Sequence, residues 1–189
     1  MKKVRLGIFI SGAGSNAKKI TEKFLQHTQI EVVKIISNNS HSPLLHDEKV
    51  GHLVEFVPSE EMTKSADFVA RCQRDFDFII LAGYLKKIQP ELIQAFPHRI
   101  FNIHPAILPN YGGKGMYGMH VHQAVFENHE KLSGITIHFV NEIYDSGQFI
   151  AHFFTNIENC SSPEQIQREV QKLEHSYYGD VIEKTILNY

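Results

Sequence analysis

Short apolar segments alternate with amphipathic ones along the first half of the chain. Residues 4–10, 31–36 and 77–82 are apolar and rich in β-branched side chains, which predicts buried strands. Residues 17–25 and 60–74 instead repeat apolar positions at the spacing of one helix face. Because strands that alternate with helices form parallel sheets, this half of the chain predicts an α/β fold.

The second half of the chain has a different pattern. A short helix at residues 90–96 begins with Pro90, which suits a first helical turn, and a strand at residues 99–101 follows it. Residues 134–140 alternate between apolar and polar positions, and residues 148–154 follow a short turn as their expected partner strand, which predicts an antiparallel hairpin. We therefore expect a mixed, mostly parallel central sheet.

Two further helices are expected in this half. Residues 120–128 have a helical pattern. Ser162 and Pro163 supply an N-cap and a first-turn proline for another helix, which is expected to run toward Ile186. Since the sequence contains no internal repeat and no linker-like stretch, we expect a single domain over residues 1–189, with helices flanking the sheet.

The composition disfavours several classes of protein. With 19 Lys and Arg against 21 Asp and Glu, the net charge of −2 gives no general attraction for nucleic acid or for an anionic membrane. The longest apolar run, at residues 78–82, is far shorter than the ~20 residues that span a bilayer. Cys72 and Cys160 have no metal-ligand spacing and fit a reduced compartment. Because the amino terminus passes directly into a strand, we expect no signal peptide and a cytoplasmic location.

A glycine-rich loop at residues 11–16 joins the first strand to the first helix. Its flexible backbone, its hydroxyl groups and the helix N-terminus together favour an anion, most simply a phosphate. Extended through Ala17, the loop also matches the dinucleotide fingerprint, so an NAD(P) site is an alternative. Against that alternative, the second strand ends in Ser37, Asn38 and Asn39 and offers no acidic residue for a ribose. A glycine turn without any ligand is the third alternative.

Asn102 and His104 stand two residues apart at the end of an expected strand. On extended backbone their side chains leave on the same face. An amide and an imidazole are the groups that polarise a carbonyl and move a proton, and Asp145, in the hairpin turn, would hold the imidazole in one tautomer. Since none of the three needs to be a nucleophile, they indicate transfer between two bound substrates. The plainer alternatives are a capped loop histidine and an aspartate that closes an Asx turn.

These motifs together resemble the phosphoribosylglycinamide formyltransferase family, which is folate-dependent. The resemblance covers nearly the whole chain and rests on residues 11–16, 102–105, 108–109, 137–140 and 145–147. It implies a Rossmann-like formyltransferase fold. It also implies that the formyl group of 10-formyltetrahydrofolate, a co-substrate, passes to the amine of glycinamide ribonucleotide in de novo purine biosynthesis, without a metal.

The resemblance implies roles for individual residues. Asn102, His104 and Asp145 would be catalytic, and Asn102 and His104 would stabilise the oxygen of a tetrahedral intermediate. The Asp145 carboxylate would raise the pKa of His104 from its ordinary value near ~6.5, so that the imidazole is protonated and donates. The residues implied to bind the ribonucleotide are Gly14, Ser15, Asn16, Gln171 and Glu174. The residues implied to bind the folate are Leu85, Lys86, Lys87, Ile88, Asn102, Asn141, Glu142, Ile143, Tyr144 and Asp145.

The loop at residues 111–119 is longer and richer in glycine than the common form in that family. Its Gly113-Lys114-Gly115 lacks the spacing of a P-loop, so we interpret it as a mobile flap beside the site. His120 and His122 do not share a helix face and are interpreted as structural. His138, on the expected strand, is interpreted as a packed or solvated residue and not as a catalyst.

Other functions fit parts of the same pattern. A formyltetrahydrofolate deformylase would use the same catalytic group with water in place of the amine, but with an N-terminal regulatory domain that is not expected here. A methionyl-tRNA formyltransferase would carry an RNA-binding domain and a basic face, which the net charge of −2 disfavours. A non-catalytic nucleotide-binding module and an NAD-dependent oxidoreductase are further alternatives. The expected partners are small molecules, with no nucleic acid or membrane, and the expected state is a monomer or a weak homodimer.

Overall fold

The computed structural model describes residues 2–189. The chain divides into two compact units, Met1–Phe101 and Asn102–Tyr189, and strand β5 (Ile100–His104) crosses the boundary between them. Within residues 2–189 the hydrogen-bonded strand order is β3-β2-β1-β4-β5-β6-β7. Pairing is parallel between β1 and β2, β1 and β4, and β2 and β3, and antiparallel between β6 and β7. The mixed, mostly parallel sheet is thus confirmed, whereas the single domain stays a prediction.

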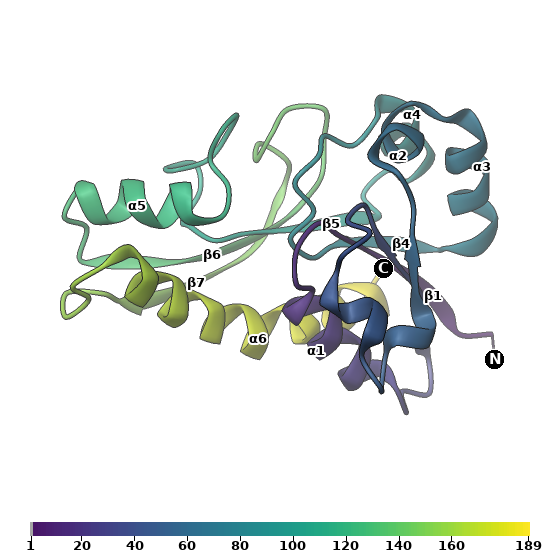
Figure 1. Ribbon diagram of the computed structural model, residues 1–189, viewed down its shortest axis with the longest axis horizontal. Helices are drawn as coiled ribbons and strands as arrows, with labels where there is room; N and C mark the ends of the chain where they lie inside the picture. The colour runs from purple at the N-terminus through teal and green to yellow at the C-terminus, as the bar shows by residue number, and fades with distance from the viewer. Residues whose placement is uncertain (1) are drawn as a thin grey trace. The chain divides into compact units, whose positions relative to one another are not determined.

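The first unit alternates strands with helices (Figure 1). Besides the start of β5, its strands are β1 (Val4–Ile10), β2 (Ile30–Ser37), β3 (Val54–Phe56) and β4 (Phe78–Leu81). Its α-helices are α1 (Ser15–Phe24), α2 (Ser59–Lys64), α3 (Ala66–Asp75) and α4 (Pro90–Ala95). Two 3₁₀ turns, η1 (Pro43–His46) and η2 (Gly51–Leu53), lead from β2 to β3.

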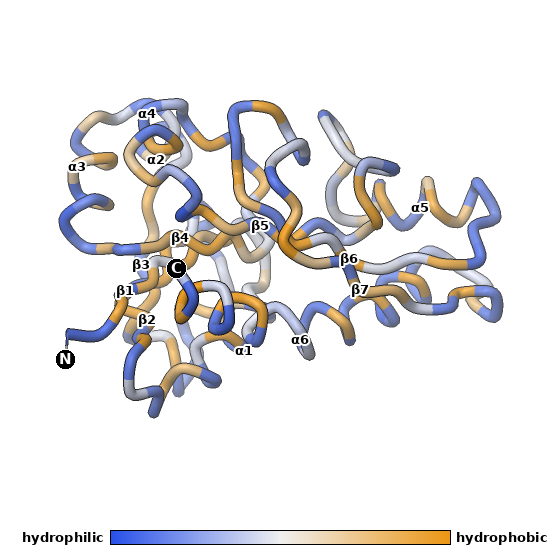
Figure 2. The backbone as a smooth tube through the Cα atoms, turned by 180° about the vertical axis from the view of Figure 1, so that it is seen from behind, coloured by the Kyte–Doolittle hydropathy of each residue, from blue (hydrophilic) through white to orange (hydrophobic). Residues whose placement is uncertain are grey.

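Strand β1 lies in the core of the first unit. Leu6, Ile8 and Phe9 each have 0% exposed surface, which is why this segment reads as a continuous apolar run and not as an alternating one. Gly7 is required between them, because a Cβ atom at this position would lie 2.6 Å from ring atoms of Phe76. Figure 2 shows the same apolar character along the neighbouring strands.

The helix predicted over residues 60–74 is wrong in one respect, because the structure has two helices there. Ser65 separates α2 from α3 with extended backbone, φ −92° and ψ 123°, and its side chain accepts a hydrogen bond from the amide of Phe68 at 3.2 Å. An N-cap serine in the interior of a helical pattern therefore ends one helix and begins the next. The three-residue strand β3 was not predicted, since it is too short to show a period of two.

The second unit contains the end of β5, followed by α5 (Met119–Glu127), β6 (Leu132–Phe139), β7 (Phe149–Asn156) and α6 (Pro163–Leu187). The antiparallel hairpin and the capping of α6 by Ser162 are as predicted. Helix α6 lies along β6 and β7 (Figure 1), and the ring of Tyr177 stacks on that of Phe153 with the centroids 4.0 Å apart. Although α6 is long, no helix of residues 2–189 combines the length and the hydropathy that a membrane crossing requires.

Candidate active site

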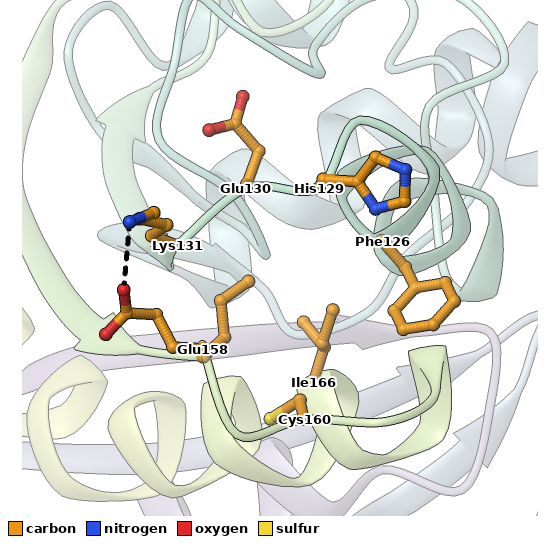
Figure 3. Close-up of a pocket in the computed structure, with 8 residues that line it drawn as sticks. Phe126, His129, Glu130, Lys131, Glu158, Cys160 and Ile166 are labelled. Carbon is orange, nitrogen blue, oxygen red and sulfur yellow. Dashed lines mark ion pairs between the residues drawn. The ribbon is translucent and has the colours of Figure 1, made fainter.

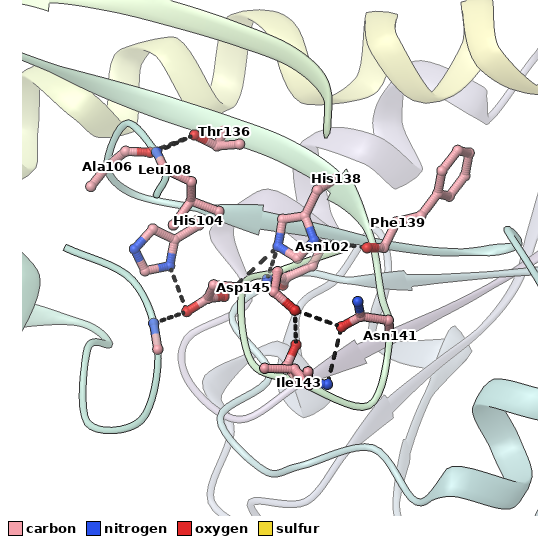
Figure 4. Close-up of polar contacts among 12 residues, drawn as sticks. Asn102, His104, Ala106, Leu108, Thr136, His138, Phe139, Asn141, Ile143 and Asp145 are labelled. Atoms are coloured by element: carbon pink, nitrogen blue, oxygen red, sulfur yellow. Dashed lines mark hydrogen bonds and ion pairs between the residues drawn. The ribbon is translucent and has the colours of Figure 1, made fainter. Parts of the chain in front are cut away.

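Strand β5 carries two of the predicted catalytic side chains. The strand extends through His104, three residues further than predicted for it. Phe101 and Ile103 are buried, and Asn102 and His104 alternate with them. Figure 4 shows the Asn102 and His104 side chains near Asp145, with the imidazole of His138 beside them. One strand thus presents an amide and an imidazole to the same region of the second unit.

His138, on β6, contacts Asn102 directly. Its Nδ1 atom lies 2.8 Å from the backbone oxygen of Phe139, and its Nε2 atom lies 3.1 Å from Asn102 Nδ2. A carbonyl oxygen needs a proton on Nδ1, so in the neutral ring Nε2 is bare and accepts a hydrogen bond from the Asn102 amide. His138 is packed, one of the two states expected for it from the sequence, but its contact with Asn102 is not among the sequence expectations. The available signal was its alternation with the buried Ile137, which directs His138 to the opposite face of β6.

Asp145 lies in the turn between β6 and β7, close to both histidines. Its Oδ2 atom is 3.5 Å from Nδ1 of His104, and its Oδ1 atom is 3.8 Å from Nε2 of His138. Only 11% of the Asp145 side chain is exposed. The structure therefore brings together the three residues that the sequence singled out as catalytic, although they come from segments about forty residues apart.

Asn141, and not Asp145, closes the turn. Its Oδ1 atom accepts hydrogen bonds from the amide of Ile143 at 3.0 Å and from the hydroxyl of Ser146 at 3.1 Å (Figure 4). The Asx-turn alternative thus applies to Asn141. Asp145 itself has φ +54°, a left-handed conformation that a short polar side chain tolerates, so its carboxylate is turned inward.

The loop after β5 approaches both His104 and Asp145. The backbone oxygen of Tyr111 lies 2.7 Å from Nε2 of His104, and the amide of Gly113 donates to Asp145 Oδ2 at 2.8 Å. The absence of a side chain at Gly112 leaves room here, because a Cβ atom would contact the Leu108 side chain closely and would lie 3.3 Å from Asp145 Cβ. The predicted flap at residues 111–119 thus begins in direct contact with His104 and Asp145.

Burial controls the protonation of His104, which is 3% exposed. It lowers the pKa of His104 below the ordinary 6.5, although the Asp145 carboxylate and the Tyr111 carbonyl both act to raise it. The expectation that Asp145 lifts this pKa is therefore wrong in its net direction, because desolvation of the imidazolium outweighs the carboxylate. Burial would raise the pKa of Asp145, but the nearby imidazoles of His138 and His104 and the Gly113 amide lower it.

His122, on α5, is buried near this group, with 3% of its surface exposed. Burial, reinforced by the neighbouring His104, lowers the pKa of His122 to about 4. Within residues 2–189 its Nδ1 atom has no hydrogen-bond partner. The same residues contain no cluster of three His, Cys, Asp or Glu side chains that would hold a metal ion.

The residues predicted to bind the ribonucleotide are divided between the two units. In the first, Gly14 has φ +73° and immediately precedes α1, whose first turn contains Ser15 and Asn16. The glycine loop is held by Ser11, whose hydroxyl accepts a hydrogen bond from the Leu85 amide at 2.9 Å. In the second unit, α6 carries the other two predicted residues, Gln171 and Glu174.

The residues predicted to bind the folate are divided in the same way. Leu85 to Ile88 follow β4 in the first unit, with Leu85 48% exposed and Ile88 5% exposed. Glu142, Ile143 and Tyr144 belong to the turn of the second unit, where Ile143 is 70% and Tyr144 43% exposed. The turn thus presents the apolar side chains of Ile143 and Tyr144 at its surface.

Comparison with known proteins identifies the family. A family model described as formyl transferase matches residues 4–182. The chain belongs to the formyl transferase family. The chain is 38% identical to the chloroplastic phosphoribosylglycinamide formyltransferase of Arabidopsis thaliana over 96% of the chain, and 29% identical to phosphoribosylglycinamide formyltransferase of Bacillus subtilis, also over 96% of the chain.

The chain spans different shares of these relatives. It covers 94% of the Bacillus subtilis protein, but only 65% of the Arabidopsis protein and 61% of a plant relative from Vigna unguiculata, which is less than two thirds of each.

Solved structures show the same fold. Phosphoribosylglycinamide formyltransferase from Bacillus halodurans is 29% identical, with a TM-score of 0.82 over 96% of this chain and 95% of that chain. Glycinamide ribonucleotide transformylase 1 from Symbiobacterium toebii is 26% identical, with a TM-score of 0.84 over 95% and 86%. These similarities confirm the Rossmann-like formyltransferase fold predicted from the sequence.

Proposed function

We propose that this protein transfers the formyl group of 10-formyltetrahydrofolate to the amine of glycinamide ribonucleotide, giving formylglycinamide ribonucleotide and tetrahydrofolate in de novo purine biosynthesis. The observation that carries the proposal is the convergence of Asn102, His104 and Asp145 around one buried region, with the Asp145 carboxylate 3.5 Å from the His104 ring. The names of the relatives supply the ribonucleotide and the formyl transfer, and the family resemblance supplies the formyl folate.

Asn102 is proposed to stabilise the oxygen of the tetrahedral intermediate. Attack by the amine forms the new nitrogen–carbon bond and moves negative charge onto the formyl oxygen. The side-chain amide of Asn102 has two N–H donors, of which one is directed to His138 Nε2 at 3.1 Å. With one donor held by His138, the other has a fixed direction in which to meet the oxyanion.

His104 is proposed to handle the proton. The attacking amine must lose a proton, and the folate nitrogen must gain one when its bond to the formyl carbon breaks, so the reaction is balanced by one transfer. Burial lowers the pKa of His104 and so favours the neutral ring, whose Nε2 donates to Tyr111; Nδ1, the atom nearest Asp145, would then take the amine proton. The resulting imidazolium would have the Tyr111 carbonyl at one nitrogen and the Asp145 carboxylate at the other.

The substrate-binding residues remain those that the resemblance implies. We propose the N-terminus of α1, with Gly14, Ser15 and Asn16, for the ribonucleotide phosphate, and Gln171 and Glu174 for the rest of that substrate. We propose residues 85–88 and 141–145, with Asn102, for the folate. A cytoplasmic location and a monomeric or weakly dimeric state are proposed from the sequence alone.

A direct assay tests the reaction. Purified protein is incubated with 10-formyltetrahydrofolate, with and without glycinamide ribonucleotide, while the folate absorbance is followed and formylglycinamide ribonucleotide is measured by mass spectrometry. We expect folate turnover only with the ribonucleotide, together with one equivalent of formylated product. Folate turnover that does not need the ribonucleotide and releases formate would instead support a deformylase.

A further inference from the structure

A hydrogen-bonded path connects the C-terminus of α5 to the ring of His104. The hydroxyl of Tyr111 donates to Oε1 of Glu130 at 2.7 Å, and the backbone oxygen of the same tyrosine lies 2.7 Å from His104 Nε2. Tyr111 thus contacts Glu130 through its side chain and His104 through its main chain. All three residues belong to the second unit.

The conformation of Tyr111 needs such a restraint. Its φ is +57°, a left-handed conformation that a bulky side chain rarely adopts. A rotation about this angle moves the Tyr111 side chain and its carbonyl group together, so holding the side chain restrains the oxygen that contacts His104. A short hydrogen bond between a hydroxyl and a carboxylate is among the stronger ones available to do so.

Glu130 is itself held by the end of α5. His129, with φ +53°, turns the chain, and the Glu130 amide donates to the backbone oxygen of Val125 at 3.3 Å. Glu130 also lines a cavity of about 320 Å³, but Figure 3 shows its carboxylate directed away from Cys160 and Ile166 on the other side. Burial, followed by the bond to Glu130, raises the pKa of Tyr111 to about 12, so the hydroxyl keeps its proton and remains a donor.

We propose that Tyr111 and Glu130 are positioning residues, which hold the Tyr111 carbonyl against His104 and thereby fix its imidazole for proton transfer. The proposal rests on the proposed function for its kinetic consequence only. We call the hydrogen bond between Tyr111 and Glu130 the tether. It holds the Tyr111 carbonyl, to which Nε2 of His104 donates its proton in a hydrogen bond, and this leaves Nδ1 of His104 facing Asp145. Loss of the tether would let the ring turn without removing any group that touches a substrate.

Four variants test the tether kinetically. Tyr111→Phe removes only the hydroxyl, Glu130→Ala removes the acceptor, and Glu130→Gln keeps a neutral acceptor in place. The matched control is Glu158→Gln, which breaks the neighbouring 3.3 Å ion pair of Lys131 with Glu158. We expect Tyr111→Phe and Glu130→Ala to lower kcat about three- to tenfold with KM within about twofold, as for one lost hydrogen bond of ordinary strength, and Glu130→Gln and Glu158→Gln to stay near the wild-type kcat.

A second measurement needs no substrate. In protein labelled with ¹⁵N-histidine, the Nε2–H proton of His104, assigned by its loss in His104→Asn, is expected to exchange slowly in the wild type. It should exchange faster in Tyr111→Phe and Glu130→Ala, but not in Glu158→Gln. Exchange rates equal to those of the control would overturn the proposal, even if kcat fell, because the tyrosine would then act on stability alone.

The two measurements separate the two proposals. A wild-type protein without formyl transfer would contradict the proposed function, and the exchange of the His104 proton would still decide whether the tether positions the ring. If Tyr111→Phe does not fold, the difference between Glu130→Ala and Glu130→Gln provides the same test. Equal exchange in those two variants and in the wild type would overturn the tether.

Discussion

The Nδ1 atom of His104 lies 3.5 Å from the Oδ2 atom of Asp145, and the two side chains are only 4% and 11% exposed. The other ring nitrogen of His104 lies 2.7 Å from the Tyr111 carbonyl. Both nitrogens therefore face acceptors, which suits an imidazolium, while burial favours the neutral ring. The two acceptors and the burial therefore act on the pKa of His104 in opposite directions. Burial outweighs the acceptors, so the resting ring binds a proton weakly, while the acceptors stabilise the imidazolium that forms during the reaction.

Replacing Asp145 with Asn tests the charge of the carboxylate while keeping its size. Asparagine tolerates the left-handed φ of +54°, so the turn should fold normally. Because the amide cannot stabilise an imidazolium, we expect kcat to fall by about 10²–10⁴, the usual contribution of a positioned acid or base. Glu127→Gln, a carboxylate change on α5, is the control. A kcat of Asp145→Asn within about twofold of wild type would contradict the role of Asp145.

His138→Phe tests whether His138 orients the Asn102 amide. The substitution keeps an aromatic ring but removes the acceptor that lies 3.1 Å from Asn102 Nδ2. An oxyanion donor that loses its fixed direction should cost part of the about 10²–10³ that such a donor supplies, so kcat should fall more than tenfold with little change in KM. His152→Phe, on the neighbouring β7, is the matched control. A change confined to the KM for folate would show that His138 shapes a pocket and does not orient Asn102.

The lowered pKa of His104 predicts the pH dependence of the reaction. If the neutral ring accepts the amine proton, activity requires the deprotonated form and is lost as the pH falls through a pKa below 6.5. Asp145, whose pKa is lowered from 3.8, stays ionised over that range. We therefore expect kcat/KM to be level above pH 6.5 and to decline on the acid side, measured between about pH 5 and 9. A profile that rises toward acid pH would instead make the protonated ring the active form.

The sequence predicted which side chains lie together better than it predicted their environment. The common direction of the Asn102 and His104 side chains was predictable, because both residues lie on one strand and their spacing is a local property of extended backbone. The contact of Asn102 with His138 joins positions 36 residues apart and depends on how β6 lies beside β5. No periodicity encodes that distance. The contact of the Tyr111 carbonyl with His104 was not predictable either, because every residue has a main-chain oxygen and the residue type does not indicate its partner.

The fold was predictable where patterns are long, and less so where one residue decides. The buried strands and the hairpin followed from apolar runs and alternation. The break between α2 and α3 depends on Ser65 alone. In the sequence a serine fits the polar face of one continuous helix, but in the structure its side chain caps the amide of Phe68 and begins a new helix. The net shift of the His104 pKa also escaped the sequence, because the extent of burial is a tertiary property.

Gly14→Ala tests the glycine loop against Gly12→Ala as control. Gly14 has φ +73°, and a Cβ atom there would lie 2.7 Å from the Leu44 side chain and 3.1 Å from that of Ile10, whereas a Cβ atom at Gly12 meets nothing within 4 Å. The left-handed conformation alone should cost about 1–2 kcal/mol, so Gly14→Ala should melt several degrees lower than Gly12→Ala. If the loop holds the phosphate, its KM for the ribonucleotide should also rise more than its KM for the folate. Equal changes in the two KM values would contradict a phosphate site there.

His122 predicts how the stability of the folded protein depends on pH. Its pKa is about 4 in the folded protein and 6.5 in the reference state, so the unfolded chain binds the proton more tightly. Stability is therefore unaffected above pH 6.5 and is lost as the pH falls from there to about 4, by up to about 3 kcal/mol from this residue. His122→Asn should flatten the free energy of unfolding over that range, measured by urea denaturation, whereas His120→Asn on the exposed side of α5 should not. An unchanged slope in His122→Asn would mean that the buried imidazole does not control acid stability.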